Sequence, residues 1–269
     1  MSIEFHWMQR STWPNTEKGL VEMAIELEQA GVTSVLLPYG PEGVDFSVYI
    51  YEILAKTKKI RMMLAIPAYA VTPEYVSKTY ETINHLPFSR GRLDINLVAG
   101  KYEQEKFDMM VEHYPGDTTI LDTHDKRVAL TEPWMEKFAG LMKVKNFNAK
   151  LCVVGSSDTT LRIADNFTDY LIVGEYQLND RFLPRMKNTK PILTIDPLIL
   201  EDGEREEDVE YKNYKFALPP NHLIKGTHDE VVAQLREKSD RFGINDFIVI
   251  TDQLDLTRIY KVIQELTQN

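Results

Sequence analysis

The sequence is short of cysteine and of long apolar runs, and each shortage excludes a class of protein. Cys152 is the one cysteine among 269 residues, so no disulfide can form within the chain. No apolar run approaches the ~20 residues that cross a bilayer, and residues 1–10 lack the basic start and apolar centre of a signal peptide. We therefore expect a cytoplasmic protein with no membrane partner.

Basic stretches are missing as well. The formal net charge is −10, and residues 201–210 alone carry seven acidic side chains and one arginine. A phosphate backbone needs a basic face, so we expect no nucleic-acid partner. Histidine, cysteine and carboxylate residues show no metal-ligand spacing, and no Ser-His-Asp set is recognisable, so we expect neither a metal centre nor a hydrolase. Cys152 lies in an apolar run, which favours a buried and unreactive thiol.

What the sequence does contain is a repeated alternation of apolar strand patterns and helical patterns, with 43 % hydrophobic and 27 % charged residues overall. The expected strands are residues 4–8, 33–37, 61–66, 93–98, 151–154, 170–173, 192–196 and 247–251. The expected helices are residues 16–30, 45–56, 72–85, 128–141, a helix from about 157, 178–186, a helix opened by Thr227, and 256–266. Eight such units predict one (β/α)8 barrel over residues 1–269, with any site at the C-terminal ends of the strands.

Residues 151–175 are the most informative segment, because they contain a strand, a tight turn, a helix and a second strand. Gly155, Ser156 and Ser157 lie where the helix begins, beside Asp158. A helix start offers unpaired backbone N–H groups and a partial positive charge, which suit a phosphate. The alternative is that Ser157 or Asp158 simply caps the helix. The local pattern leaves both interpretations open.

Several segments, in order, resemble one known family, the flavin-dependent luciferase-like monooxygenases and especially their alkanesulfonate monooxygenase branch. The matching segments are FSRGR at 88–92, NLVAG at 96–100, VGSSD at 154–158, YLIVGE at 170–175, KGT at 225–227 followed by VV at 231–232, and FGINDF at 242–247. Together they cover most of the chain.

The resemblance implies a barrel that binds reduced flavin mononucleotide (FMN), supplied by a separate flavin reductase, and uses O2 to oxidise a small organic substrate. Carried over by position, Gly155, Ser156 and Ser157 would hold the flavin phosphate. His124 and Arg127 would lie close to it, where the family has a histidine and an arginine opening a helix. The tyrosine that follows in the family is a valine here, and His124 could equally be a surface residue.

The resemblance also places the flavin ring. Asn96, Ala99 and Gly100 would line the ring and ribitol at the end of the fourth strand. The family often has a non-proline cis peptide after its third strand, which puts Ala68 and Tyr69 at the ring's seat.

Two departures from the branch concern its substrate. Where alkanesulfonate enzymes carry a histidine after the first strand and an arginine with a histidine on the seventh, this chain has Ser-Thr-Trp at 11–13 and Leu-Thr-Ile-Asp at 193–196. A sulfonate needs such cations, so we expect an uncharged substrate. Five aromatic residues could line its pocket or simply pack: Trp13, Tyr39, Tyr69, Tyr102 and Tyr114.

Other functions remain open on the same fold. The chain could be a non-catalytic flavin-binding protein, because a barrel can keep a cofactor seat and lose its chemistry. It could also be an oxidoreductase that uses a deazaflavin. The family's long insertion after the seventh strand is short here, so a lid would be small or supplied by a partner subunit. We expect a homodimer or a higher oligomer.

Overall fold

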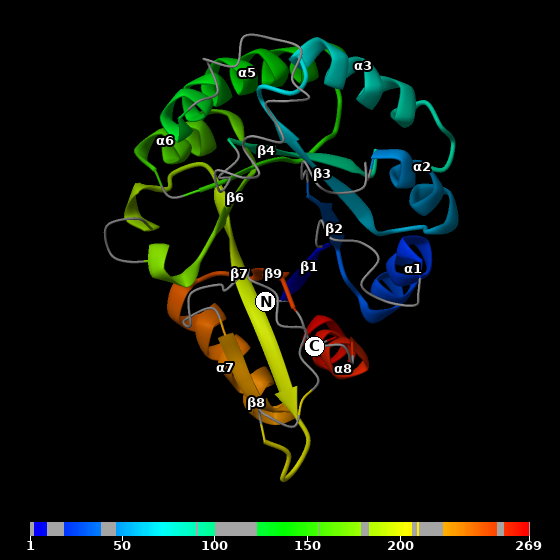
Figure 1. Cartoon of the computed structure of the whole chain (residues 1–269), viewed down its shortest axis with the longest axis vertical. Helices are drawn as coiled ribbons and strands as arrows, with labels where there is room; N and C mark the ends of the chain where they lie inside the picture. The colour runs from blue at the N-terminus through cyan, green and yellow to red at the C-terminus, as the bar shows by residue number, and fades with distance from the viewer. Residues whose placement is uncertain are drawn as a thin grey trace.

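The chain forms a closed barrel of parallel strands surrounded by helices (Figure 1). The computed structural model describes residues 3–9, 19–38, 47–89, 91–99, 123–155, 157–178, 183–205, 209, 223–251 and 256–268. The strands are β1 (Glu4–Met8), β2 (Ser34–Leu37), β3 (Arg61–Pro67), β4 (Leu93–Val98), β5 (Leu151–Val154), β6 (Tyr170–Val173), β7 (Lys190–Leu200), β8 (Leu223–Thr227) and β9 (Asp246–Val249). Neighbours follow the order β6-β5-β4-β3-β2-β1-β9-β7, and a β6–β7 pairing closes the ring, which confirms the predicted (β/α)8 fold.

The helices lie outside the strands. They are α1 (Leu20–Ala30), α2 (Ser47–Lys56), α3 (Pro73–Asn84), α5 (His124–Lys145), α6 (Asp158–Phe167), α7 (His228–Phe242) and α8 (Leu256–Gln268). Side-chain caps mark several starts, because Thr72, Thr123 and Ser157 each accept a hydrogen bond from the backbone N–H three residues on. No helix of the described ranges combines the length and apolarity that a bilayer crossing requires.

Three predicted boundaries are wrong. Of the helix predicted at 178–186, the described residues contain the 3-10 turn η3 (Leu183–Arg185), and a second such turn, η2 (Glu175–Gln177), precedes it. A short apolar run cannot distinguish such turns from an α-helix. The helix predicted at 128–141 begins four residues earlier, at the Thr123 cap. The strand predicted at 192–196 runs on to Leu200. Its second half, from Asp196, leaves the barrel and pairs with β8.

Strand alternation divides the core into two layers. Side chains that point outward, such as Phe5, Val35 and Leu97, pack under the helices in the larger cluster. Side chains that point inward fill the barrel: Leu36, Met63, Ala65, Cys152, Ile172, Ile192 and Ile248, with Met8, Val98 and Tyr170 partly buried against them. The barrel is therefore packed inside and open only at its ends.

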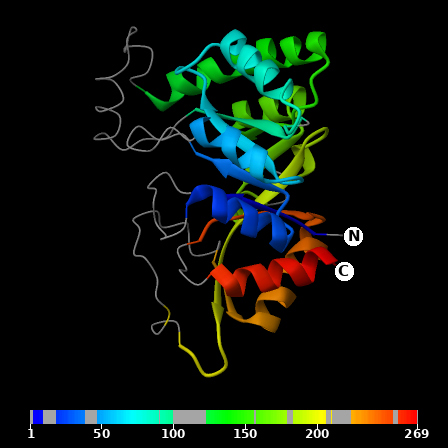
Figure 2. The same ribbon diagram turned by 90° about the vertical axis from the view of Figure 1, so that its right-hand side faces the viewer.

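The two ends of the barrel differ. Figure 2 shows that β1 begins and α8 ends on one side of the molecule, whereas α8 and α5 begin on the other. That second side holds the C-terminal ends of the strands, which is where (β/α)8 enzymes place their sites. We call it the barrel mouth, and the opposite side the barrel base.

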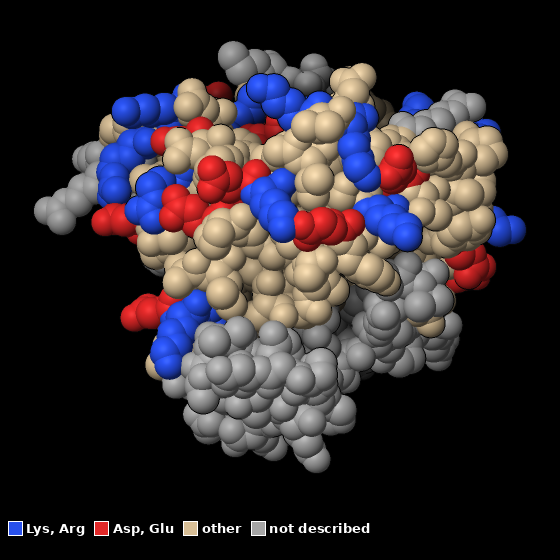
Figure 3. All heavy atoms as spheres, turned by 90° about the horizontal axis from the view of Figure 1, so that it is seen from above, with Lys and Arg blue, Asp and Glu red and all other residues tan. Residues whose placement is uncertain are grey.

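The outer face over α3 and α5 carries charges of both signs, interleaved among uncharged side chains (Figure 3). Lysines of α5 form ion pairs with glutamates of α3, as in Lys137–Glu74 and Lys145–Glu81, and Arg162 of α6 pairs with Glu132. These pairs explain the interleaved pattern over this part of the surface.

Candidate functional site

The barrel mouth brings together three segments that the sequence singled out. Strands β3, β4 and β5 are consecutive neighbours, with Pro67 paired to Val98 and Leu97 paired to Val153. The turn holding Ala68 and Tyr69, the end of β4 with Asn96 and Ala99, and the β5–α6 turn with Gly155 and Ser157 therefore follow three adjacent strands on one side of the barrel. Gly100 and Ser156 lie outside the described residues.

An apolar surface lines this part of the mouth. Val98 and Val154, the last residues of β4 and β5, point into the barrel, as do Asn96 and Cys152 two residues earlier. Val154 is 41 % exposed, which is unusual for a valine at the end of a barrel strand. An exposed apolar surface at a barrel mouth is suited to an aromatic ring.

Asn96 supplies a polar group just below that surface. Its side chain is 2 % exposed, and its Oδ1 has no hydrogen-bond partner within the described part of the chain. A buried amide oxygen without a partner costs stability, and native proteins rarely leave one without a reason. A ligand at the mouth that donates a hydrogen bond would provide the reason.

The start of α6 follows β5 through Gly155. Ser157 caps the helix, since its Oγ accepts the N–H of Thr160 at 3.1 Å, as the simpler of the two interpretations predicts. This cap satisfies one of the amide groups at the helix start, so it does not exclude a phosphate on the others. Gly155 has a φ of +143°, and a Cβ there would lie 2.9 Å from Thr160 Oγ1. Only glycine fits this turn without strain.

Arg185 brings a positive charge to the same helix start, which the sequence did not predict. Its Nη2 lies 2.7 Å from Oδ1 of Asp158, the first residue of α6. The arginine belongs to η3, on the connection after β6. No motif or spacing marks it, because the contact depends on how that connection passes α6.

The first turn of α5 holds the other two predicted phosphate residues. His124 is exposed at the first helical position, and Arg127 is buried one turn later. Trp134 fixes the helix against the β3–α3 connection, because its Nε1 donates to the carbonyl oxygen of Val71 at 2.7 Å. Arg127 is thus in a fixed element, whereas His124 fits the alternative of a surface residue.

The far side of the mouth carries carboxylates. Thr194 and Asp196 of β7 share the inward face with Ile192, so the seventh strand offers a hydroxyl and a carboxylate in place of the family's cations. Glu175, after β6, accepts a hydrogen bond from Lys238 Nζ of α7 at 2.5 Å. Of the five aromatic residues considered for the pocket, Tyr69 is buried, and Trp13, Tyr39, Tyr102 and Tyr114 lie outside the described residues.

Cys152 is not part of the candidate chemistry. The residue is fully buried in the barrel, and burial raises the pKa of its thiol well above the ordinary value, with the Asp94 carboxylate adding to the effect. The predicted burial is therefore confirmed, and a thiol with a raised pKa is a poor nucleophile.

No protein-family model matches the sequence. Solved structures resemble the fold over almost its whole length. They include EDTA monooxygenase from Chelativorans sp. BNC1, with a TM-score of 0.75, 13 % identity, and coverage of 100 % of this chain and 94 % of that one. A second is the coenzyme F420-dependent tetrahydromethanopterin reductase from Methanopyrus kandleri, with a TM-score of 0.70, 13 % identity and coverage of 100 % and 98 %.

A third is the oxygenating constituent of 3,6-diketocamphane monooxygenase from the CAM plasmid of Pseudomonas putida, in complex with FMN. It has a TM-score of 0.67, 12 % identity, and coverage of 99 % of this chain and 97 % of that one. Identities this low show a shared fold and do not carry an activity across. The fold that the luciferase-like resemblance implies is confirmed.

Proposed function

We propose that this chain binds a flavin-type cofactor at the barrel mouth and is an oxidoreductase acting on a small, uncharged organic substrate. In its fuller form the proposal is a monooxygenase that receives reduced FMN from a separate reductase and uses O2. The observation that carries it is the arrangement around β4, β5 and α6: an exposed apolar surface, a buried amide oxygen with no partner among the described residues, and a glycine turn at a helix start.

These residues fit the two halves of FMN separately. The planar ring needs an apolar surface with one or two polar groups at its edge, which Val98, Val154 and Asn96 provide. The phosphate needs N–H donors, which the start of α6 provides, and the guanidinium of Arg185 lies beside them in an ion pair with Asp158 that a phosphate would have to share. Reduced flavin, when bound, supplies the two electrons that let one oxygen atom of O2 enter the substrate while the other leaves as water.

The residues of the chain contribute binding and orientation to this reaction. Ala99 keeps the end of β4 small, so a flat ring can approach the backbone there. Gly155 does the same at the β5–α6 turn, where a side chain would meet Thr160. The inward layers of Met63, Cys152 and Ile192 close the barrel beneath the mouth and exclude water from below.

The carboxylate of Asp196 supports an uncharged substrate. A sulfonate or carboxylate substrate would meet like charge at the seventh strand, where the alkanesulfonate branch has cations. We expect this repulsion to exclude anionic substrates from the barrel mouth.

A deazaflavin of the F420 type is a second candidate cofactor. The F420-dependent reductase resembles this chain as closely as the FMN-bound monooxygenase does, with TM-scores of 0.70 and 0.67. Both cofactors carry a flat tricyclic ring and a phosphate, and the described mouth does not separate them. The two are distinguished by direct binding.

The test is a calorimetric titration of the purified protein with FMN, riboflavin and F420 in parallel. We expect FMN to bind at least tenfold more tightly than riboflavin, because the α6 start contributes only when a phosphate is present. Ala99→Phe should abolish binding while the melting temperature stays near that of the parent. Equal affinities for FMN and riboflavin would refute the phosphate seat.

Turnover separates an enzyme from a flavin-binding protein. With a flavin reductase, NADH and a panel of neutral ketones, alkanes and thioethers, we expect O2 consumption coupled to product, independent of a chelator. Tight FMN binding with no coupled product across the panel would favour the non-catalytic alternative. We also expect a homodimer or higher oligomer in solution, measured by light scattering.

A further inference from the structure

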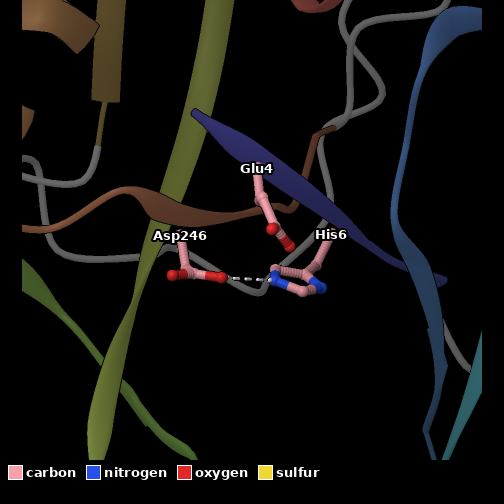
Figure 4. A group of neighbouring side chains, drawn as sticks. All are labelled: Glu4, His6 and Asp246. Atoms are coloured by element: carbon pink, nitrogen blue, oxygen red, sulfur yellow. Dashed lines mark hydrogen bonds and ion pairs between the residues drawn. The ribbon is translucent and has the colours of Figure 1, made fainter. Parts of the chain in front are cut away.

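Three potential metal ligands meet at the barrel base, at the end opposite the mouth. Glu4 and His6 lie on β1 and point into the barrel, and Asp246 begins β9 beside them (Figure 4). Strand register pairs Glu4 with Asp246. One ligand atom from each of the three side chains lies within 4.8 Å of the other two. The residues are separate from the flavin seat, because Glu4 and Asp246 are the first residues of their strands and His6 is only two residues further along β1.

We propose that Glu4, His6 and Asp246 bind one divalent first-row transition-metal ion of the Zn²⁺ type. The Nε2 of His6 lies 3.3 Å from Oδ1 of Asp246. Two ligands bound at ~2.0–2.2 Å to a tetrahedral metal are separated by roughly 3.3–3.6 Å, so this pair already has the required spacing. One imidazole nitrogen with two carboxylates is a set that zinc and its neighbours accept, with a fourth position left for water.

The imidazole of His6 is held in the orientation that a ligand needs. His6 is 4 % exposed, and its Nδ1 lies 2.7 Å from the hydroxyl oxygen of Ser34 on β2. A metal-binding histidine typically donates its second ring N–H to an oxygen, which fixes the tautomer and aims the other nitrogen at the metal. Ser34 can play that part, and Nε2 then faces the two carboxylates.

Local charge favours a cation at this place. Two carboxylates face one imidazole, and the nearest arginine in strand register, Arg61 beside Ser34, is already bound through two hydrogen bonds to Asp94. Asp246 is largely buried, with 16 % of its side chain exposed, so water screens it poorly. A divalent ion would neutralise the pair of carboxylates without disturbing the Arg61–Asp94 contact.

The site would join the first and the last barrel strands along the chain. β1 comes first along the chain and β9 supplies its last barrel strand, and they pair side by side. A metal that binds both strands stabilises the folded state by mass action, because the unfolded chain does not hold the ligands together. We therefore assign the ion a structural role, distinct from the redox chemistry proposed at the mouth.

The test begins with protein stripped by a chelator, free of flavin, and dialysed. Calorimetric titration with ZnCl2 should show one site per chain with a micromolar or lower Kd, and CoCl2 should give the visible absorption bands of a low-symmetry Co²⁺ site. Glu4→Gln and Asp246→Asn should each weaken Zn²⁺ binding at least tenfold and remove the Zn²⁺-dependent rise in melting temperature.

The matched control is the surface pair His228–Glu265, whose Nε2–Oε2 distance is 2.8 Å and whose carboxylate also binds Arg236. Glu265→Gln should leave Zn²⁺ binding unchanged. Glu4 is exposed, so Glu4→Gln should fold even if a change at buried His6 does not. The proposal is overturned if stripped wild-type protein shows no site below 100 µM Zn²⁺, or if the site persists in both carboxylate variants. In that event His6 and Asp246 form only a hydrogen-bonded pair.

Discussion

The guanidinium of Arg61 donates two hydrogen bonds to the carboxylate of Asp94 inside the barrel, with Nε 2.6 Å from Oδ2 and Nη2 2.5 Å from Oδ1. Asp94 is buried, and its Oδ1 also accepts the backbone N–H of Lys150 at 2.7 Å. The hydrogen bond to Asp94 raises the pKa of Arg61, an effect that burial opposes. Asp94 on β4 therefore links β3, through Arg61, to the residue that precedes β5, through Lys150, and its negative charge is balanced by the positive charge of Arg61.

Removing the carboxylate should leave that charge without compensation. We predict that Asp94→Ala lowers the free energy of unfolding by about 3–5 kcal/mol, because the partly buried guanidinium of Arg61 loses its partner and the backbone N–H of Lys150 loses its acceptor. Glu132→Ala, which breaks the similarly two-pronged but exposed pair with Arg162, should cost no more than about 1 kcal/mol. Urea denaturation measures both. Equal costs for the two variants would show that burial of the barrel pair is energetically unimportant.

A substitution at Asn96 should have opposite effects on thermal stability and on flavin affinity. Replacing it with leucine removes a buried amide oxygen that has no partner in the described chain, so Asn96→Leu should melt at or above the parent temperature. The same change should weaken flavin binding at least tenfold if the amide meets the cofactor. Calorimetry and thermal denaturation report the two effects independently. Unchanged flavin affinity in a stable variant would remove Asn96 from the site.

Gly155 and Gly140 form a matched pair of glycine positions. At Gly155 a Cβ would lie 2.9 Å from Thr160 Oγ1 on a backbone with positive φ, so Gly155→Ala should destabilise the protein by about 1–3 kcal/mol. Gly140 lies in the helix interior of α5, where an added methyl group would meet nothing within 4 Å, so Gly140→Ala should stabilise by about 0.4–1 kcal/mol.

Cofactor binding gives the second readout for this pair. Gly155→Ala should reduce the affinity for FMN more than the affinity for riboflavin, because the turn leads into the phosphate seat. Gly140→Ala should leave both affinities as they are. Titration of each variant with both flavins checks this, and an equal loss for the two flavins at Gly155 would point to a general disturbance of the mouth.

Glu28 should make the free energy of unfolding depend on pH in the acidic range. Its carboxylate accepts backbone N–H groups from Lys58, Lys59 and Ile60 at 2.6 to 2.9 Å. Burial is the largest single influence and raises the pKa, but the three hydrogen bonds together bring it below the ordinary value of 4.5. A depressed folded-state pKa stabilises the protein above the unfolded-state pKa, and this contribution is lost as pH falls through the folded-state value.

Glu28→Gln should therefore reduce the free energy of unfolding at pH 7 by about 1–2 kcal/mol, and the difference from wild type should shrink below about pH 4.5. Denaturant titrations between pH 7 and pH 3 measure the trend. Glu136→Gln, at an exposed position of α5, controls for the change in net charge. A pH-independent difference would assign the loss to geometry rather than to the charge.

The barrel could be predicted from the sequence because most strands are short apolar runs followed by a helical pattern, and several of those helices begin at a capping residue. β8 could not, since Leu223 and Ile224 are its only apolar residues and its partner is the part of β7 that leaves the barrel. The extension of β7 past Asp196 could not be predicted either, because Asp196 and Pro197 interrupt the apolar run before Leu198, Ile199 and Leu200. It depends on β8 being available as a neighbour.

The candidate site divides in the same way. Gly155 and Ser157 are visible in the sequence because turn and cap chemistry is local. The contact of Arg185 with Asp158 depends on how distant segments pack, and so does the lack of a partner for Asn96 Oδ1 among the described residues. Alternation along β1 marks His6 as inward-facing, but Asp246 lies 240 residues away, so spacing alone could not reveal the cluster at the barrel base.

The 240 residues between His6 and Asp246 also delay the pairing of β1 with β9 during synthesis. At about 5–20 residues per second, roughly 12–50 s pass between the making of β1 and the making of β9. Throughout that interval the edge of β1 that pairs with β9 has unsatisfied N–H and C=O groups, which invite pairing with other chains. Slower translation lengthens this exposure, so the yield of native protein should fall when codons ahead of β9 are made rare, even though no residue of the folded barrel has changed.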